Sequence, residues 1–157
     1  MIAIGQKLPS VNLSELTPDG MVSHDLNTLF ANKKVVLFAV PGAFTPTCSD
    51  EHLPGYVILA DQFKAKGVDI IACVSVNDAF VMSAWGKAQN ASELMMLADG
   101  DGSFSRALGL EMDTGSFGGV RSQRYAMVID NGVVTLLNVE EPKSFEVSKA
   151  DVVLTSI

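Results

Sequence analysis

The stretch KKVVLFAVPGAFTPTC, residues 33–48, decides the fold of this chain. Residues 35–40 form an unbroken apolar run rich in β-branched side chains, which is typical of a strand buried on both faces of a sheet. Pro41 ends this strand, and the apolar residues that follow recur at helical spacing. The stretch therefore predicts a buried strand leading into a helix that starts near Thr47 or Cys48. Pro54 lies inside the helical pattern and predicts a kink there.

Strands and helices alternate along the rest of the chain. Apolar runs predict strands at 68–76, 94–98, 124–130 and 133–139, with a short strand or hairpin at 10–23, and helical periodicity predicts helices at 79–89, 103–108 and 148–157. We expect Asn77 or Asp78, Ser103, and the Ser148–Asp151 pair to cap these helices. The order predicts an α/β fold in one domain, residues 1–157, with a central mixed β-sheet flanked by helices. A thioredoxin-like sandwich is one of the folds compatible with it.

The composition is that of a compact domain, with 48% hydrophobic and 18% charged residues among 157. A formal net charge of −7 argues against binding nucleic-acid phosphates. No apolar run is long enough to span a membrane, and no secretory signal is visible. Two cysteines without such a signal lead us to expect a reducing compartment, the cytoplasm.

Several functional motifs are absent from the sequence. There is no G-x-x-x-x-G-K-[ST] and no G-x-G-x-x-G, so phosphate and nucleotide cradles have no support. The two histidines and two cysteines do not have zinc-site spacing, and no C-x-x-C dithiol occurs. We therefore expect neither a metal nor a cofactor.

Cys48 is the residue with the clearest chemical potential. The first turn of a helix presents unpaired N–H groups with partial positive charge, and these favour a thiolate over a thiol. Thr45, three residues earlier, is placed to turn its hydroxyl toward the same sulfur. Pro41 has no N–H to compete and fixes the chain direction. An isolated cysteine is usually a small buried apolar residue, but this position favours a reactive thiol.

The same residues resemble a known family. Pro41, Thr45 and Cys48 match P-x-x-x-T-x-x-C, the peroxidatic signature of the peroxiredoxins. The stretch GAFTPTCSDEHLPGY (42–56) closely resembles the atypical, type II branch, and the similarity continues through CVSVNDAFVMSAWG (73–86) and RSQRYAMVIDNGVV (121–134). The resemblance implies a thioredoxin-like fold and a thiol peroxidase. It also implies that Cys48 becomes a sulfenic acid as hydrogen peroxide or an organic hydroperoxide is reduced.

The resemblance also implies a catalytic arginine, and Arg124 occupies its place. Its guanidinium would stabilise the Cys48 thiolate and polarise the peroxide, although Arg121 is an alternative on pattern alone. His52, four residues after Cys48, either tunes the pocket, relays a proton or simply packs. Three phenylalanines resemble pocket or dimer-contact residues of this branch, although aromatic residues are more often simple core; they are Phe44, Phe80 and Phe117.

The fate of the sulfenic acid is the question that the resemblance leaves open. Cys73 lies in a buried run, and residues 140–157 contain no cysteine. We prefer a cycle in which glutathione and glutaredoxin regenerate Cys48. The alternatives are a thioredoxin-dependent cycle through a Cys48–Cys73 disulfide, a peroxide-sensing redox protein with little turnover, and a non-enzymatic binding module on the same fold. We also expect a homodimer.

Overall fold

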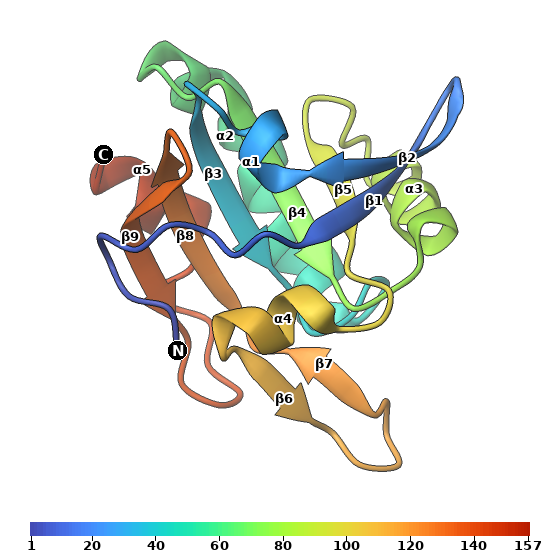
Figure 1. Cartoon of the computed structure of the whole chain (residues 1–157). Helices are drawn as coiled ribbons and strands as arrows, with labels where there is room; N and C mark the ends of the chain where they lie inside the picture. The colour runs from blue at the N-terminus through green and yellow to red at the C-terminus, as the bar shows by residue number, and fades with distance from the viewer.

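The computed structural model describes all residues, 1–157, and contains one mixed sheet of seven strands in the order β2-β1-β5-β4-β3-β8-β9 (Figure 1). β3 is parallel to β4, and β4 is parallel to β5, whereas the outer pairs are antiparallel. The strands of this sheet are β1 (Asn12–Thr17), β2 (Gly20–Asp25), β3 (Lys34–Ala39), β4 (Ile70–Ser75), β5 (Met95–Ala98), β8 (Tyr125–Asp130) and β9 (Val133–Val139).

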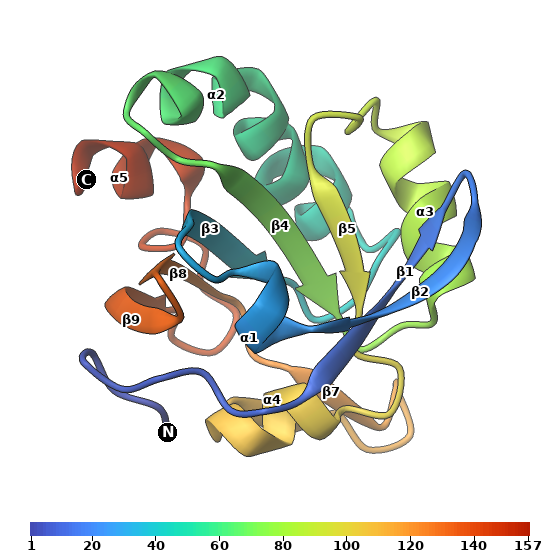
Figure 2. The same ribbon diagram turned by 45° about the horizontal axis from the view of Figure 1, so that its top comes forward.

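Helices cover both faces of the sheet. α2, α3 and α5 lie on one side, and α1 and α4 lie on the other (Figure 2). β6 and β7 form a separate two-stranded sheet. The bounds are α1 (Leu26–Leu29), η1 (Cys48–His52), α2 (Leu53–Ala65), α3 (Ala79–Ala88), α4 (Ser103–Leu108), α5 (Ala150–Thr155), β6 (Glu111–Asp113) and β7 (Val120–Ser122). The predicted α/β architecture is therefore confirmed. α1, β6 and β7 were not predicted from the sequence.

β3 is buried on both faces, as predicted. Val36, Phe38 and Val40 belong to the core beneath α2 and α3, while the alternating residues of the same strand belong to the second core beneath α4. Every residue from Val35 to Val40 is completely buried. This central strand therefore gives a rigid base to the segment that follows it.

The helix after β3 starts with an irregular turn. Helical backbone begins at Pro46 and continues as the π-helix η1, in which the Leu53 N–H donates to the Cys48 carbonyl five residues back. α2 follows directly, with Pro54, which has no N–H to donate, in its first turn. The kink predicted at Pro54 therefore takes the form of a change from π to α hydrogen bonding just before it.

Two of the three predicted caps are wrong. Asp78 caps α3 as expected, by accepting from the Val81 N–H. Ser103 is the first residue of α4 rather than its cap, and the buried Asp99 accepts from N–H groups of that helix instead. Ser148 does not cap α5, which begins at Ala150, because its N–H and hydroxyl both donate to Glu140.

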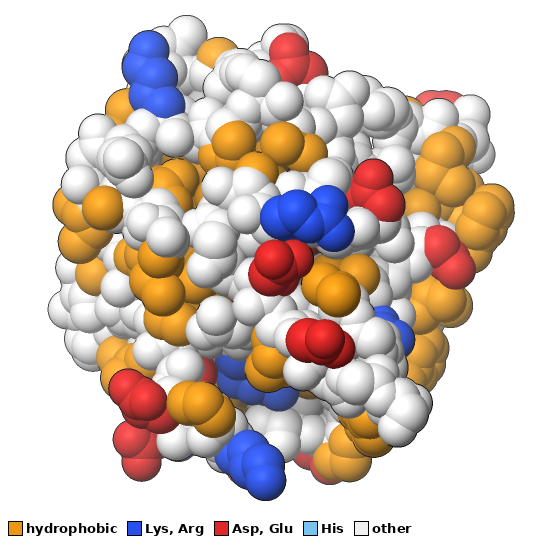
Figure 3. All heavy atoms as spheres, turned by 60° about the horizontal axis from the view of Figure 1, so that its bottom comes forward, with side chains coloured by type: hydrophobic (Ala, Val, Ile, Leu, Met, Phe, Trp, Pro, Cys, Tyr) orange, Lys and Arg blue, Asp and Glu red, His pale blue; other side chains and the backbone are white.

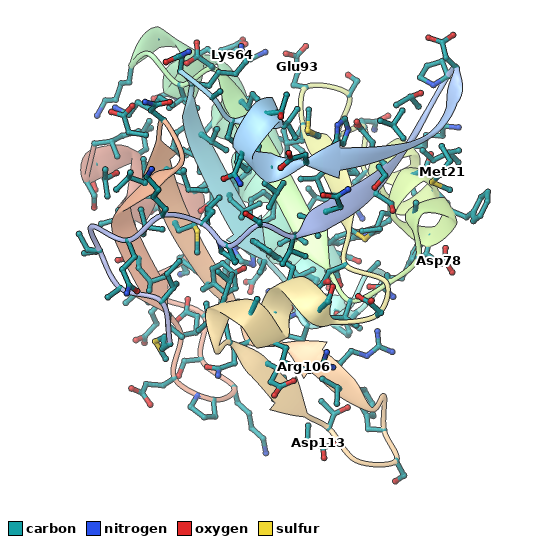
Figure 4. The ribbon with its side chains drawn as sticks, viewed as in Figure 1. Met21, Lys64, Asp78, Glu93, Arg106 and Asp113 are labelled. Carbon is teal, nitrogen blue, oxygen red and sulfur yellow. The ribbon has the colours of Figure 1, made fainter.

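Charged side chains lie on the surface at both ends of the sheet. Lys64 of α2 and Glu93, before β5, form an exposed ion pair at one end, and Asp113 of β6 lies near the other (Figure 4). Exposed pairs of this kind contribute little to stability. No helix has the length and apolar character needed to cross a membrane.

Candidate active site

The register of β3 against β8 builds the site. The two strands are antiparallel, with Ala39 opposite Tyr125. Arg124, the residue before Tyr125, therefore lies beside the segment that follows Ala39, which carries Pro41 and Cys48. This meeting point is at the lower end of the sheet in Figure 1, where the loop after β9 also descends.

The Cys48 sulfur contacts a guanidinium. Arg124 Nη2 donates to Cys48 Sγ over 3.1 Å, and Cys48 is completely buried. Arg121, the alternative from the sequence pattern, is engaged elsewhere, because its Nε and Nη1 donate to the carbonyls of Gly118 and Val76. Arg124 is therefore the arginine that can stabilise a thiolate at Cys48.

His52 holds the other arm of the same guanidinium. Arg124 Nη1 lies 2.8 Å from His52 Nδ1, and His52 Nε2 lies 3.2 Å from the Ser148 carbonyl. A guanidinium only donates, so Nδ1 is the bare acceptor nitrogen and Nε2 carries the proton. Burial and the Arg124 charge lower the pKa of His52 to about 3, against weaker opposing effects of Ser148 and Glu140. The imidazole is therefore neutral at physiological pH.

The Thr45 hydroxyl gives its proton to a backbone carbonyl. Its Oγ1 donates to the Gly42 carbonyl over 2.7 Å, and not to the Cys48 sulfur. The Thr45 carbonyl accepts from the Ser49 N–H over 2.9 Å, which anchors the first helical turn. With its proton committed to Gly42, the hydroxyl oxygen is left as an acceptor.

A pocket of about 570 Å³ lies over Arg124. Pro41, Thr47 and Arg124 form part of its lining, β6 contributes Glu111 and Met112, and the loop 140–145 supplies another wall. The lining does not include Cys48, but it includes Arg124, which contacts the buried sulfur. In Figure 3, which brings this end of the molecule forward, hydrophobic side chains are mixed with single charges of both signs.

The three phenylalanines that the resemblance gave as pocket or dimer-contact residues are exposed. Phe44, Phe80 and Phe117 are 56%, 64% and 88% exposed, and none lines this pocket. The aromatic residue at the site is Phe145, which the sequence did not single out. Its ring centre lies 5.7 Å from the Arg124 guanidinium carbon and 5.1 Å from the His52 ring. Phe145 therefore packs against the guanidinium on the sulfur and against the imidazole that holds this guanidinium.

Cys73 is a buried, free thiol in the central strand β4. Burial, and secondarily the neighbouring Cys48, raises the pKa of Cys73 well above its usual value. It therefore stays protonated at neutral pH and is a poor nucleophile in this conformation.

Glu140 and Ser148 are further polar residues of the site that sequence reasoning missed. Burial alone would raise the pKa of Glu140, but hydrogen bonds from Ser148, Glu146 and Val147 outweigh it and lower the pKa below its usual value. Ser148 is completely buried beside His52. The only signal in the sequence was the Ser148–Asp151 spacing, which pointed to a helix cap instead.

A cysteine after a central strand, with an arginine on its sulfur, is typical of a thiol-based redox protein of thioredoxin-like fold. Residues 3–154 match the Redoxin family. The chain is 48% identical to chloroplastic peroxiredoxin-2E of Arabidopsis thaliana, over 99% of this chain and 69% of that protein. It is 47% identical to peroxiredoxin-2C of Oryza sativa subsp. japonica, over 99% and 98%.

A solved structure is closely similar as well. Reduced Prx3 from Vibrio vulnificus, crystallised in complex with hydrogen peroxide, has 73% identity and a TM-score of 0.99, with 99% of each chain covered. The chain belongs to the peroxiredoxin family. It is thus a thiol peroxidase, an antioxidant oxidoreductase that reduces peroxides at the expense of a thiol.

The buried neutral imidazole predicts an acid-dependent loss of stability. The pKa of His52 falls from 6.5 to about 3 on folding, so the unfolded chain binds the extra proton first. The contribution of neutral His52 to the free energy of unfolding is therefore present above pH 6.5 and is lost as the pH falls from 6.5 toward 3. Between pH 7 and pH 5 it declines by about 2 kcal/mol.

Urea unfolding at several pH values measures this decline. His52→Gln should flatten the stability profile between pH 6.5 and pH 5 relative to the parent. His24→Gln leaves the buried imidazole in place and should keep the decline. An unchanged profile in His52→Gln would show that another group is responsible.

Proposed function

We propose that Cys48 is the peroxidatic nucleophile and that it reduces hydrogen peroxide and organic hydroperoxides to water and alcohols. The observation that carries this proposal is the contact of Arg124 Nη2 with Cys48 Sγ at 3.1 Å, beneath an accessible pocket. The Vibrio vulnificus relative was crystallised with hydrogen peroxide, which supports that substrate for this chain.

The reaction is an in-line displacement. The Cys48 thiolate attacks one peroxide oxygen, a new S–O bond forms, and the O–O bond breaks. The sulfur is oxidised by two electrons to the sulfenic acid, and the leaving oxygen takes a proton and departs as water or an alcohol. Negative charge spreads over both oxygens in the transition state, where fixed donors stabilise it.

Three groups around the sulfur have complementary roles in this scheme. Arg124 donates to the thiolate and to the developing charge on the peroxide. The Thr45 oxygen, whose proton goes to Gly42, accepts the hydrogen of the attacked peroxide oxygen. Pro41 lines the pocket and brings no competing N–H donor.

For regeneration we propose glutathione and glutaredoxin as the reductant. Glutathione condenses with the Cys48 sulfenic acid, releasing water, and glutaredoxin or a second glutathione frees the thiolate. Cys48 is buried, so an incoming thiol requires η1 to open, but η1 is a short π-helical turn with exposed Asp50 and Glu51. A Cys48–Cys73 disulfide, reduced by thioredoxin, also requires access to the central strand β4, which makes it the second candidate.

Exposed aromatic side chains bear on the oligomeric state. Phe44 and Phe80 are exposed, and Phe44 lies 6.4 Å from Trp85 on α3, the helix that carries Phe80. This aromatic surface supports a homodimer.

The two free thiols support a compartment that keeps cysteines reduced, and we propose the cytoplasm.

Cysteine variants test the nucleophile and the cycle together. Cys48→Ser should lower peroxide turnover by about 10² or more, because a serine hydroxyl is not ionised near pH 7. Cys73→Ser is the matched control and should keep most of the glutathione-supported activity. The measurement is peroxide consumption with glutathione and glutaredoxin, and with thioredoxin and its reductase.

Two outcomes would contradict the proposal. Cys48→Ser activity within about tenfold of the parent would exclude Cys48 as the nucleophile. A Cys73→Ser protein that forms sulfenic acid but does not turn over would make Cys73 the resolving thiol. A parent protein that reacts once and does not cycle with either reductant would instead be a peroxide sensor.

Arginine variants test thiolate stabilisation. Arg124→Ala should lower the rate constant for peroxide by about 10² and the fraction of thiolate at pH 7. Arg124→Lys should recover only part of the rate constant and of the thiolate fraction, because an ammonium lacks the fork of donors. Arg106→Ala, on the exposed face of α4, is the control. A thiolate absorbance titration that is the same in Arg124→Ala and the parent would refute this role.

Light scattering tests the proposed homodimer. At micromolar concentration we expect the mass of two chains, and Phe80→Asp should shift the protein toward the monomer because it places a charge in the apolar contact. Ile58→Asp, at an exposed position on α2, should leave the dimer intact. A monomeric mass for the parent would contradict the assignment.

A further inference from the structure

A single carboxylate oxygen closes the loop that forms one wall of the pocket. Glu140, directly after β9, accepts at Oε2 from the Glu146 N–H at 2.7 Å, the Ser148 N–H at 2.9 Å and the Ser148 hydroxyl at 2.6 Å. The Glu140 N–H donates to the Arg124 carbonyl over 3.0 Å. The carboxylate therefore ties both ends of the 141–147 segment to the strand end that carries Arg124.

These hydrogen bonds to Glu140, which we call the Glu140 clamp, also orient the Ser148 carbonyl. Because both donors of Ser148 are held by Glu140, its carbonyl is directed to the opposite side, where it accepts from the Tyr56 hydroxyl at 2.8 Å and from His52 Nε2 at 3.2 Å. Ser148 and His52 are completely buried, so water cannot replace these partners cheaply. The carbonyl therefore keeps the imidazole proton on Nε2.

The position of that proton decides what Arg124 can contact. With Nε2 protonated, Nδ1 offers a lone pair to Arg124 Nη1 at 2.8 Å, and Nη2 of the same fork reaches Cys48 Sγ at 3.1 Å. The other tautomer would set an N–H against the guanidinium, and a fork that loses one contact is free to rotate away from the sulfur.

We propose that Glu140 and Ser148 are positioning residues for peroxide reduction: Glu140 orients Ser148, the Ser148 carbonyl selects the His52 tautomer, and His52 holds the Arg124 guanidinium on the Cys48 sulfur. Phe145 contributes to the same positioning, because the loop that Glu140 holds packs the Phe145 ring against Arg124 and His52. The inference rests on the proposed role of Arg124 and Cys48. It adds that their geometry depends on a carboxylate that touches neither of them with its side chain.

The test compares two carboxylates of the same loop. Glu140→Gln removes the charge, and an amide oxygen in the place of Oε2 accepts more weakly from the same three donors. Glu146→Gln removes an equal charge from an exposed side chain that makes no hydrogen bond. We expect Glu140→Gln to lower the rate constant of the reduced protein with hydrogen peroxide by about tenfold, since misplacement of a reacting group by 1 Å can cost ~10². Glu146→Gln should match the parent.

The second readout is the ¹⁵N chemical shifts of the His52 imidazole, which report the tautomer without any reaction. The parent should show the pure Nε2–H form, and Glu140→Gln a mixture. If Glu140→Gln fails to fold by circular dichroism, Ser148→Ala carries the test, because it keeps the carbonyl but loses the hydroxyl. It should move both readouts in the same direction by a smaller amount.

A folded Glu140→Gln protein with a parental rate overturns the proposal. So does a slow variant with an unchanged His52 tautomer, because the effect would then run by another route. A parent that forms no sulfenic acid would refute the proposed function instead, while the tautomer measurement would still report on the clamp.

Discussion

The guanidinium of Arg124, bonded on one side to the Cys48 sulfur and on the other to His52, is the interaction on which the rest of the site depends. A thiolate without a partner is strongly disfavoured in a buried position, and so is a guanidinium. The two opposite charges compensate each other's cost of burial, and the β3–β8 register brings them together. The central strand, buried on both faces, keeps that register from slipping.

The neutrality of His52 is the second half of this arrangement. A protonated imidazole would repel Arg124 and would have no lone pair to offer it. Burial lowers the pKa of His52 to about 3 and so removes that state at physiological pH. The chain thereby keeps a single positive charge beside the sulfur, held by a neutral acceptor, and in the proposed reaction its donors are in place before peroxide arrives.

Much of the fold and the centre of the site could be predicted because their signals are local. The apolar run of β3, the apolar runs at 124–130 and 133–139, and the spacing of Pro41, Thr45 and Cys48 are each readable within a few residues. Glu140, Ser148 and Phe145 could not be found in this way. Ser148 meets His52 across 96 positions of sequence, and an isolated serine or glutamate in a loop has no pattern that announces a buried partner.

The errors have the same origin. Ser148 has the spacing of a helix cap, but its N–H and hydroxyl both donate to the carboxylate of Glu140 instead. Thr45 is three residues before the cysteine, yet its hydroxyl finds the nearer carbonyl of Gly42. The exposure of Phe44, Phe80 and Phe117 is not an error of the prediction but a feature that it left undecided, because an apolar side chain in sequence does not say whether it faces the core, a pocket or a second chain.

We propose that the sulfur held by Arg124 is the atom that takes oxygen from peroxide. The decisive measurement is intact-mass and peptide analysis of reduced Cys73→Ser protein treated with one equivalent of hydrogen peroxide. The protein should gain one oxygen atom, located on Cys48 and trapped by a sulfenic-acid reagent. An unchanged mass while peroxide persists, or oxygen located on a methionine with Cys48 still a free thiol, would contradict it.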